Sequence, residues 1–360
     1  MKTYVFPGQG SQKKTMGGTL FDEFESLTRA ADSILGYSIK ELCLEDPDNR
    51  LNRTEFTQPA LYVVNALSYY KKLQESERPD FLAGHSLGEF NALLAAECFS
   101  FETGLRLVRK RGELMARAQE GAMAAVLNAS AQEIRTILDD NGLTSIDLAN
   151  FNSASQIVIS GPPEDIKAAK PLFQSGKHLF APLNTSGAFH SRYMEPARQE
   201  FSRFLDTVTF SPQKVPVISN VTARPYEDHR AKELLAGQLT GAVRWSDSVQ
   251  YLLGLGEMEF KELGHGNVLT KLINKIRREA PQQPQQQPRP TAAQPPLSAE
   301  ELVRQWNERN PVGTRVRSKV GEYQDLETAT PATVLFGHRA AVYMIGYRGY
   351  FDLTEIESVN

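Results

Sequence analysis

Ser86 stands in the stretch LAGHSLGEF, between Gly84 and Gly88 and next to His85. A serine hydroxyl is a weak nucleophile until the backbone exposes it and a nearby base accepts its proton. The preceding DFLAG is typical of a buried strand, and the apolar spacing of EFNALLAAECF predicts a helix behind the serine. Strand, glycine turn, serine and helix form the context of a nucleophile elbow, whereas an ordinary glycine turn is the alternative. We interpret Ser86 as a catalytic nucleophile.

His190, in TSGAFHSRYM, is the candidate base among six histidines. His85 adjoins the serine, but neighbouring side chains at an elbow point apart, so we expect it to have an orienting or oxyanion-side role. His190 follows a predicted inserted subdomain, where the chain returns to the cleft. A predicted strand, a charged loop, a glycine turn and the C-terminal tail hold the other four, which are His178, His229, His265 and His338.

The elements that must position these side chains follow an α/β order. TYVFPGQGSQ predicts a first strand that ends in a turn, and helical spacing recurs near 60–74, 89–98 and 100–117. Residues 122–184 read strand, helix, strand, strand, helix, strand, with TSIDLAN at 144–150 as the second strand. This βαββαβ order predicts a ferredoxin-like subdomain inserted in a larger α/β body. A cleft between the two parts is a natural ligand site.

A Pro/Gln-rich linker divides the chain at residues 280–296. Twelve of the seventeen residues in APQQPQQQPRPTAAQPP are Pro or Gln, too poor in apolar side chains to join a core. Residues 1–121 and 185–279 then form the core, residues 122–184 the subdomain, and residues 297–360 a tail. LSAEELVRQW in the tail predicts a helix with a capping box from Ser298 to Glu301, and the Val-, Tyr- and Phe-rich stretch behind it predicts a small β-rich module.

Composition excludes several classes of function. The chain has 360 residues, 41% of them hydrophobic, and a net charge of only -3, so neither nucleic acid nor an anionic membrane is an expected partner. No apolar stretch reaches the length of a membrane span, and the N-terminus is no secretory signal, so we expect a cytoplasmic protein. Cys43 and Cys98 have no metal-site spacing and are interpreted as buried apolar residues.

Eight motifs occur in an order that resembles malonyl-CoA:acyl-carrier-protein transacylases: FPGQGSQ, TQPAL, GHSLGEFNALLAA, RLVRKRGELM, NFNSASQIVISG, GAFHS, VRW and ELGHGNVLTKL. The resemblance spans residues 1 to about 279. The forms GHSLGEFNALLAA and GAFHS are most similar to the free-standing acyltransferases of trans-acyltransferase polyketide synthases, or of hybrid peptide and polyketide assembly lines. The resemblance implies an α/β-hydrolase-like core carrying the ferredoxin-like subdomain.

The resemblance also implies a ping-pong mechanism. Ser86 would attack the malonyl thioester while His190 takes its proton, and the phosphopantetheine thiol of an acyl carrier protein would then collect the acyl group. The backbone N–H groups of Gln9 and Leu87 would bind the oxyanion. The backbone carbonyl of Gln238, in place of an acidic residue, would orient the histidine. No metal or redox cofactor is implied.

Arg111 is the residue that the resemblance assigns to substrate choice. It lies 25 positions after Ser86 in RKRGEL, where the family places a guanidinium that pairs with the malonyl carboxylate. A solvated basic helix face is the alternative. Phe189 resembles the bulky residue of malonyl-selective enzymes and would crowd an α-methyl branch, and Asn150 and Asn152 would line the cleft or form a turn.

Two departures and two competing functions stay open. Gly264, His265 and Gly266 stand where the family usually has Gly-Pro-Gly, and the tail has no assigned role, although it could dock on other synthase subunits. The same scaffold could serve an acyl hydrolase that removes stalled acyl groups from carrier proteins, but such an enzyme would be expected to lack Arg111. A non-enzymatic docking role rests only on the tail and the linker.

Overall fold

The computed structural model describes residues 1–75, 78–118, 121–174, 176–280, 298–318, 325–335, 339–347 and 350–359. The chain divides into two compact units, Met1–Pro281 and Gln282–Asn360. Apart from Ala280, the linker predicted at 280–296 lies outside the described residues, as does His338. Within the described ranges, no helix combines the length and the apolar character that a membrane span requires.

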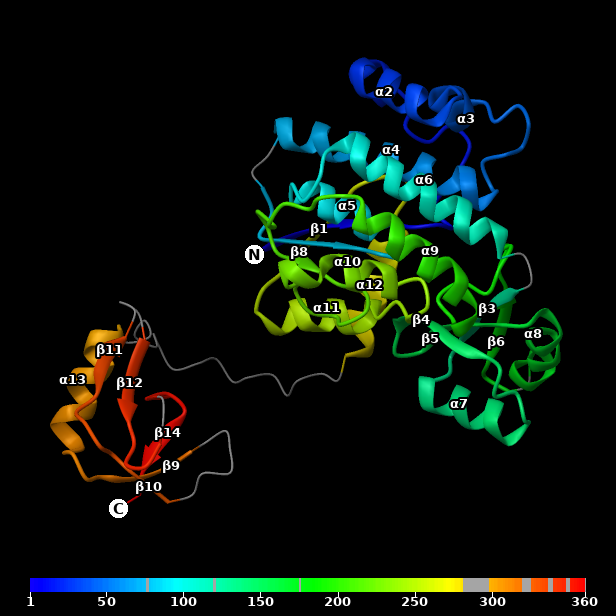
Figure 1. Ribbon diagram of the computed structural model, residues 1–360. Coiled ribbons are helices and arrows are strands. Elements are labelled where there is room, and N and C mark those ends of the chain that lie inside the picture. Colours follow the sequence, from blue (N-terminus) through cyan, green and yellow to red (C-terminus); the bar gives the residue numbers. More distant parts are fainter. Residues whose placement is uncertain are drawn as a thin grey trace. The chain divides into compact units, whose positions relative to one another are not determined.

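A four-stranded parallel sheet forms the centre of the first unit (Figure 1). Its order is β7-β2-β1-β8, and the strands are β1 (Lys2–Phe6), β2 (Phe81–Gly84), β7 (Val217–Ile218) and β8 (Glu259–Glu262). Strands β1, β2 and β7 are mostly apolar and almost wholly buried, as expected for strands covered on both faces. Parallel strands place their carboxyl ends at one edge of a sheet, and Ser86 follows the end of β2 there.

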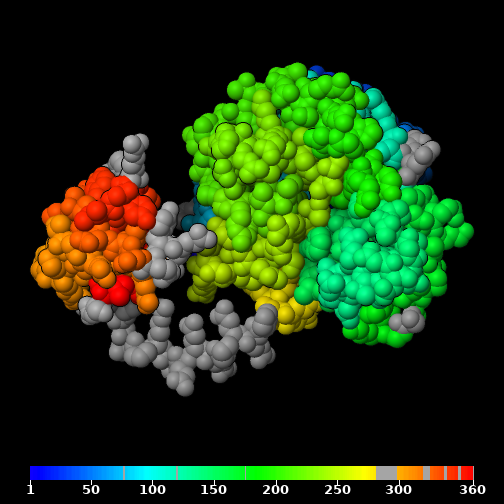
Figure 2. All heavy atoms as spheres, turned by 60° about the horizontal axis from the view of Figure 1, so that its bottom comes forward, coloured from blue at the N-terminus to red at the C-terminus, as the bar shows by residue number. Residues whose placement is uncertain are grey.

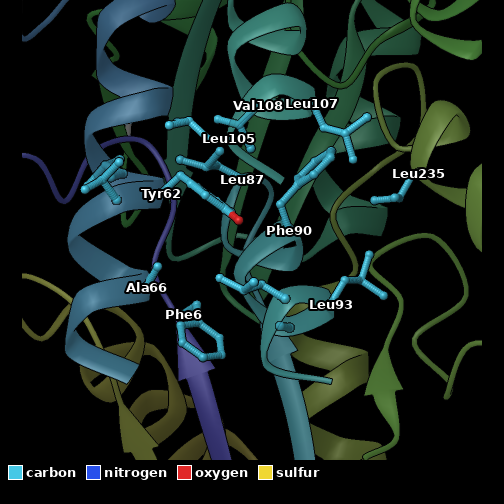
Figure 3. Close-up of a cluster of buried hydrophobic side chains, with 14 of the residues drawn as sticks. Phe6, Tyr62, Ala66, Leu87, Phe90, Leu93, Leu105, Leu107, Val108 and Leu235 are labelled. Carbon is cyan, nitrogen blue, oxygen red and sulfur yellow. The ribbon is translucent and has the colours of Figure 1, made fainter. Parts of the chain in front are cut away.

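Helices cover both faces of this sheet. Alternate side chains of β1 enter different cores, since Tyr4 and Phe6 belong to one apolar cluster and Val5 to another. The larger cluster is formed with α4 (Thr54–Glu75), α5 (Gly88–Ala95), α6 (Phe101–Arg117), α9 (Glu195–Asp206) and α10 (Ala231–Gly237). The smaller one is formed with α11 (Trp245–Gly254) and α12 (Val268–Glu279). Figure 3 shows Tyr62, Phe90 and Val108 of α4, α5 and α6 in the larger cluster.

Helix α6 shows how the local sequence places a charge in a core. It begins after Ser100, whose hydroxyl accepts a hydrogen bond from Thr103 N and so caps the helix. Its buried positions recur at 104–105, 107–108, 111–112 and 114–115, the spacing of one helix face. Arg111 therefore lies in the buried stripe, and the alternative of a solvated basic face is wrong for this residue.

A second, antiparallel sheet of order β4-β5-β3-β6 follows in the chain (Figure 1). Its elements are β3 (Ala122–Leu127), α7 (Ala131–Asp140), β4 (Asp147–Ser153), β5 (Gln156–Gly161), α8 (Pro163–Ala169) and β6 (Leu179–Pro182). The strand expected at 144–150 begins three residues later, because Ile146 N closes a turn on Leu143 O. Strand β4 packs on α11 and α12, and Figure 2 shows this teal-green lobe beside the yellow-green surface of those helices.

The remaining helices of the first unit come first in its sequence. They are α1 (Leu20–Glu23), α2 (Glu25–Leu35) and α3 (Ile39–Leu44).

The second unit has its own small core. Its helix α13 (Ala299–Arg309) has the predicted capping box from Ser298 to Glu301. Two antiparallel sheets follow, β10-β9-β14 and β11-β12-β13. Their strands are β9 (Arg315–Ser318), β10 (Leu326–Glu327), β11 (Thr333–Leu335), β12 (Arg339–Tyr343), β13 (Tyr350–Asp352) and β14 (Ile356–Ser358).

Candidate active site

The turn that carries Ser86 is held tight by two glycines. A Cβ atom on Gly84 would lie 1.9 Å from the carbonyl carbon of Gly88, and one on Gly88 would lie 2.0 Å from Phe6 O. Ser86 itself has a φ of 51°, in the left-handed region that a non-glycine residue seldom adopts. Such strain persists where the surrounding structure imposes it, and it is frequent at functional sites. The turn thus lifts the hydroxyl above the end of β2 and the start of α5.

His190 lies within hydrogen-bond distance of the Ser86 hydroxyl. Its Nε2 lies 2.8 Å from Ser86 Oγ, and its Nδ1 lies 2.8 Å from the backbone oxygen of Gln238. A carbonyl can only accept, so Nδ1 carries the proton and Nε2 presents a lone pair to the serine. His190 also has a positive φ, 57°, and is 4% exposed. The structure therefore brings Ser86, His190 and Gln238 together in the relation that a nucleophile, a base and an orienting group require.

Burial keeps this imidazole neutral. It lowers the pKa of His190 to about 3, and the positive charge of Arg111 acts in the same direction, while the hydrogen bond to Gln238 opposes both. At neutral pH the ring is therefore available to accept the proton of Ser86.

The same pKa predicts a pH effect on stability. Because His190 has its ordinary pKa in the unfolded chain and a lower one in the folded protein, the unfolded state binds the extra proton below about pH 6.5. The free energy of unfolding should fall as the pH drops from 6.5 toward 3, with a contribution of up to ~1.4 kcal/mol per pH unit. Urea titrations of the protein and of His190→Asn at several pH values test this. If the free energy of unfolding changed with pH in the same way in both proteins, the prediction would be wrong.

Arg111 lies beside Ser86 and His190 and is fully buried. Its Nη1 donates to Gln58 Oε1 at 2.8 Å, and its Nη2 donates to Gln238 Oε1 at 2.8 Å and to Ser86 Oγ at 3.1 Å. Within the described residues its Nε is buried without a hydrogen-bond partner. Burial lowers the pKa of Arg111 to about 10, so it stays cationic at neutral pH. A planar cation with an unused donor next to the nucleophile suits a substrate that carries a carboxylate close to its reacting carbonyl.

Leu87 and Gln9 lie next to the turn that carries Ser86. Leu87 is the N-cap of α5, so its backbone N–H belongs to the helix end whose donors have no partner within the helix. Gln9 follows Gly8, where a Cβ would lie 2.3 Å from His85 O, so the first turn of the chain packs directly on the elbow. The side chain of Gln9 donates to Thr54 Oγ1 at 3.2 Å.

Gln9, His85, Asn150 and Asn152 line one cavity of about 370 Å³ between the core and the second sheet. His85 Nε2 lies 2.8 Å from Asn152 Oδ1, so this histidine turns away from the serine. A second cavity, of about 540 Å³, opens at His190. The predicted cleft residues Asn150 and Asn152 thus line the first cavity, whose described lining does not include Ser86, His190 or Arg111.

Phe189 and His265 complete the predicted residues. Phe189 is 4% exposed and packs in the larger core directly before the base. His265 lies in the turn between β8 and α12. There Gly264 has a φ of 131°, and a Cβ on it would lie 2.0 Å from Asn65 Oδ1. No group of three or more potential metal ligands occurs among the described residues.

Three residues of the site were not identified from the sequence. Gln58 accepts from Arg111, and it stands in the TQPAL motif, which is the signal that could have found it. Asn220 Oδ1 accepts from Ser86 N at 2.7 Å, and Glu89 accepts from Asn220 N at 2.9 Å. Asn220 follows a strand of only two residues and carries no local pattern, so the sequence offers no signal for it.

Comparison with known proteins assigns the chain to a family. The protein-family model described as acyl transferase domain matches residues 3–316 of the chain. The chain is 57% identical over 287 residues to the polyketide biosynthesis malonyl CoA-acyl carrier protein transacylase BaeC of Bacillus velezensis, covering 79% of this chain and 99% of BaeC. The chain therefore belongs to the acyl transferase domain family, and it is an acyltransferase by membership.

Solved structures agree with this assignment. The malonyl CoA-acyl carrier protein transacylase of Burkholderia pseudomallei is 57% identical and superposes with a TM-score of 0.77, covering 78% of this chain and 99% of that one. A malonyl-transacylase solved in complex with a type II polyketide synthase acyl-carrier protein is 31% identical, with a TM-score of 0.73, 76% of this chain and 92% of the other being covered. The predicted α/β fold of the acyltransferase body is confirmed at this level.

Proposed function

We propose that this protein is a malonyl-CoA:acyl-carrier-protein transacylase that loads extender units in polyketide or hybrid peptide and polyketide biosynthesis. The observation that carries the proposal is the guanidinium of Arg111, which lies 3.1 Å from Ser86 Oγ in a fully buried position. A buried cation there favours an acyl group that ends in a carboxylate. The names of BaeC and of the Burkholderia pseudomallei structure support this substrate.

The first half-reaction uses the geometry around Ser86. Arg111 binds the malonyl carboxylate, and His190 Nε2 takes the proton of Ser86 Oγ as that oxygen attacks the thioester carbonyl. The N–H groups of Gln9 and Leu87 stabilise the oxyanion of the tetrahedral intermediate. The C–S bond then breaks, and His190 returns the proton to the sulfur of CoA. A malonyl ester on Ser86 remains.

The second half-reaction reverses these steps with the phosphopantetheine thiol of a carrier protein. His190 takes the thiol proton, sulfur attacks the seryl ester, and the proton returns to Ser86 Oγ. No metal or redox cofactor takes part in either step. The complex of a related transacylase with its carrier protein supports a carrier protein as the acceptor.

The finer fold assignment belongs to the same proposal. The parallel order β7-β2-β1-β8, with a serine after β2, supports an α/β-hydrolase-like core over residues 1–121 and 185–279. The order β4-β5-β3-β6 with two helices supports a ferredoxin-like subdomain over residues 122–184. Residues 280–296 would be the linker and 297–360 a module that docks on other synthase subunits. We place the protein in the cytoplasm.

An acyl hydrolase is the competing function, and Arg111 argues against it because hydrolysis of varied acyl groups needs no carboxylate site. The test is incubation of the protein with malonyl-CoA, acetyl-CoA or methylmalonyl-CoA, with and without a phosphopantetheinylated carrier protein. Intact mass then follows the acyl group on both proteins. A malonyl adduct that passes to the carrier supports the transferase, whereas release of free malonate or stripping of a loaded carrier supports the hydrolase.

Phe189 provides a prediction on the acyl branch. Replacing it with Ala opens space next to His190 for one methyl group, which a tight pocket discriminates by about 10- to 200-fold. We expect kcat/KM for methylmalonyl-CoA relative to malonyl-CoA to rise at least about tenfold. Because Phe189 is part of the core, thermal unfolding is measured in parallel, and Phe189→Leu serves as the variant that keeps most of the bulk. An unchanged ratio in a folded Phe189→Ala protein would remove Phe189 from substrate choice.

A further inference from the structure

Glu89 is a buried carboxyl group that the mechanism above does not use. It lies in the first turn of α5, three residues after Ser86, and is 0% exposed. Among the described residues it is the only carboxyl group in the buried class, just as Arg111 is the only buried guanidinium. A charged group in such a position needs partners, because burial without them is costly.

Glu89 has three hydrogen-bond partners, and two of them, Asn220 and Gln238, also hold the proposed catalytic residues. Tyr226 Oη donates to Oε1 at 2.6 Å and Asn220 N donates to the same oxygen at 2.9 Å, while Gln238 Nε2 donates to Oε2. Asn220 accepts from the backbone N–H of Ser86. Gln238 accepts from His190 through its backbone and from Arg111 through its side chain.

Gln238 therefore links two opposite charges. Its Oε1 accepts from the Arg111 guanidinium at 2.8 Å, and its Nε2 donates to Glu89. The charge of Arg111 lowers the pKa of Glu89, and that of Glu89 raises the pKa of Arg111. Above about pH 7, where Glu89 is mostly ionised in the free protein, one buried cation and one buried anion balance.

A malonyl group disturbs this balance. Its carboxylate would add a second negative charge beside Arg111, which leaves the buried set with a net charge of -1. Like charges at short range in a low dielectric cannot all remain ionised, and the group that most readily accepts a proton does so. Arg111 is already fully protonated at neutral pH, and the malonyl carboxylate is held by it.

We propose that Glu89 is a positioning residue that supplies the counter-charge of Arg111 in the free enzyme and takes up a proton when the malonyl carboxylate pairs with Arg111. This inference rests on the proposed malonyl transfer. It links the choice of a charged acyl group to the hydrogen bonds that hold Gln238 and Asn220, and hence to the base and the nucleophile.

The titratable groups around Glu89 leave a clear pH window. Burial raises the pKa of Glu89 to about 7, against the hydrogen bonds from Tyr226, Asn220 and Gln238. Burial raises the pKa of Tyr226 well above its usual value and lowers that of Arg111 only to about 10. The pKa of His190 is lowered to about 3, and burial lowers that of His85 below its usual value. Between pH 6.5 and 8, Glu89 is thus the group of this set that changes its charge.

The proton count of the half-reaction makes the proposal measurable. Ser86 Oγ–H and malonyl-CoA give the malonyl ester and CoA–SH, so the chemical step neither takes up nor releases a proton while the thiol stays protonated. If the equilibrium constant for malonylation falls as the pH rises, the enzyme takes up a proton when the malonyl ester forms. Ionisation of the CoA thiol would have the opposite sign, since it favours malonylation as the pH rises.

The experiment equilibrates the full-length protein with malonyl-CoA and CoA at fixed ratios between pH 6.0 and 8.0. Intact-mass spectrometry of quenched samples then gives the malonylated fraction of the protein. We expect the equilibrium constant to fall by up to about tenfold per pH unit above pH 7, and by at least about threefold across the range. A constant value in the unmodified protein overturns the proposal, whereas absence of any malonyl adduct overturns the proposed function itself.

Variants identify the group that takes up the proton. Glu89→Gln should form the adduct with an equilibrium constant that does not change with pH, and a persisting slope would assign the proton elsewhere. Glu113→Gln is the matched control, because Glu113 lies on α6 two residues after Arg111 and pairs with Arg109 at the surface. It should keep the slope. If Glu89→Gln does not fold, Tyr226→Phe decides, since loss of the phenol donor raises the pKa of Glu89 and should move the decline to higher pH.

Discussion

Ser86→Ala should abolish the acyl-enzyme and lower the rate of malonyl transfer by at least about 1,000-fold. The proposed malonyl ester forms on the Ser86 hydroxyl oxygen, and loss of this nucleophile removes the covalent route as a whole. Its oxygen lies 2.8 Å from His190 Nε2, so the proposed base is already within hydrogen-bond reach. The measurement is intact mass after mixing with malonyl-CoA, together with the rate of carrier loading.

Ser191 offers the matched control for this substitution. It is also buried and follows His190 directly, but its hydroxyl donates to the backbone oxygen of Ala188. Ser191→Ala should therefore still form the malonyl adduct. A malonyl adduct on the Ser86→Ala protein would place the nucleophile elsewhere and refute the site.

Arg111→Ala should lower kcat/KM for malonyl-CoA by about 100- to 1,000-fold, the usual range when one partner of a buried charge pair is removed. The same change should reduce the preference for malonyl-CoA over acetyl-CoA by a similar factor, because an uncharged acyl group loses no ion pair. Arg111→Lys should recover only part of the rate, since an ammonium group cannot donate to Gln58, Gln238 and the substrate in one plane. Steady-state kinetics with both donors are the test.

Arg109 on the same helix is the matched control for this prediction. It lies at the surface, where it pairs with Glu113 and donates to the backbone oxygen of Ile34. Arg109→Ala should leave donor choice unchanged. An Arg111→Ala protein that still prefers malonyl-CoA as strongly as before would mean that another group binds the carboxylate.

Local sequence was sufficient for the elbow and for much of the fold. A glycine on each side of Ser86, an apolar strand before it and helical spacing behind it are short-range signals, and the close approaches at Gly84 and Gly88 explain why no larger residue occurs there. The α/β order of the body also follows from such signals. The start of β4 was placed three residues too early, because a turn at 143–146 is apolar enough to resemble a strand.

Local sequence was not sufficient to predict the buried charge of the site. Arg111 stands in a run of basic residues that resembles a solvated helix face, and only the resemblance to the family gave it a role. The buried positions of α6 show the physical reason, since Arg111 repeats the helical spacing of Leu107, Val108, Leu114 and Met115. A charge on that face can persist only beside polar partners, and Gln58 and Gln238 supply them.

By itself, the sequence predicted the nucleophile and determined the order of the elements and the family's motifs, because each of these depends on neighbours along the chain. Only the tertiary structure decided the network that makes the serine usable. Glu89 and Gln238 are 149 positions apart, and Ser86 and Asn220 are 134 apart, yet each pair is joined by a hydrogen bond. Such contacts arise where the sheet, α5 and α10 meet in one core, and no local pattern encodes them because their partners are chosen by packing.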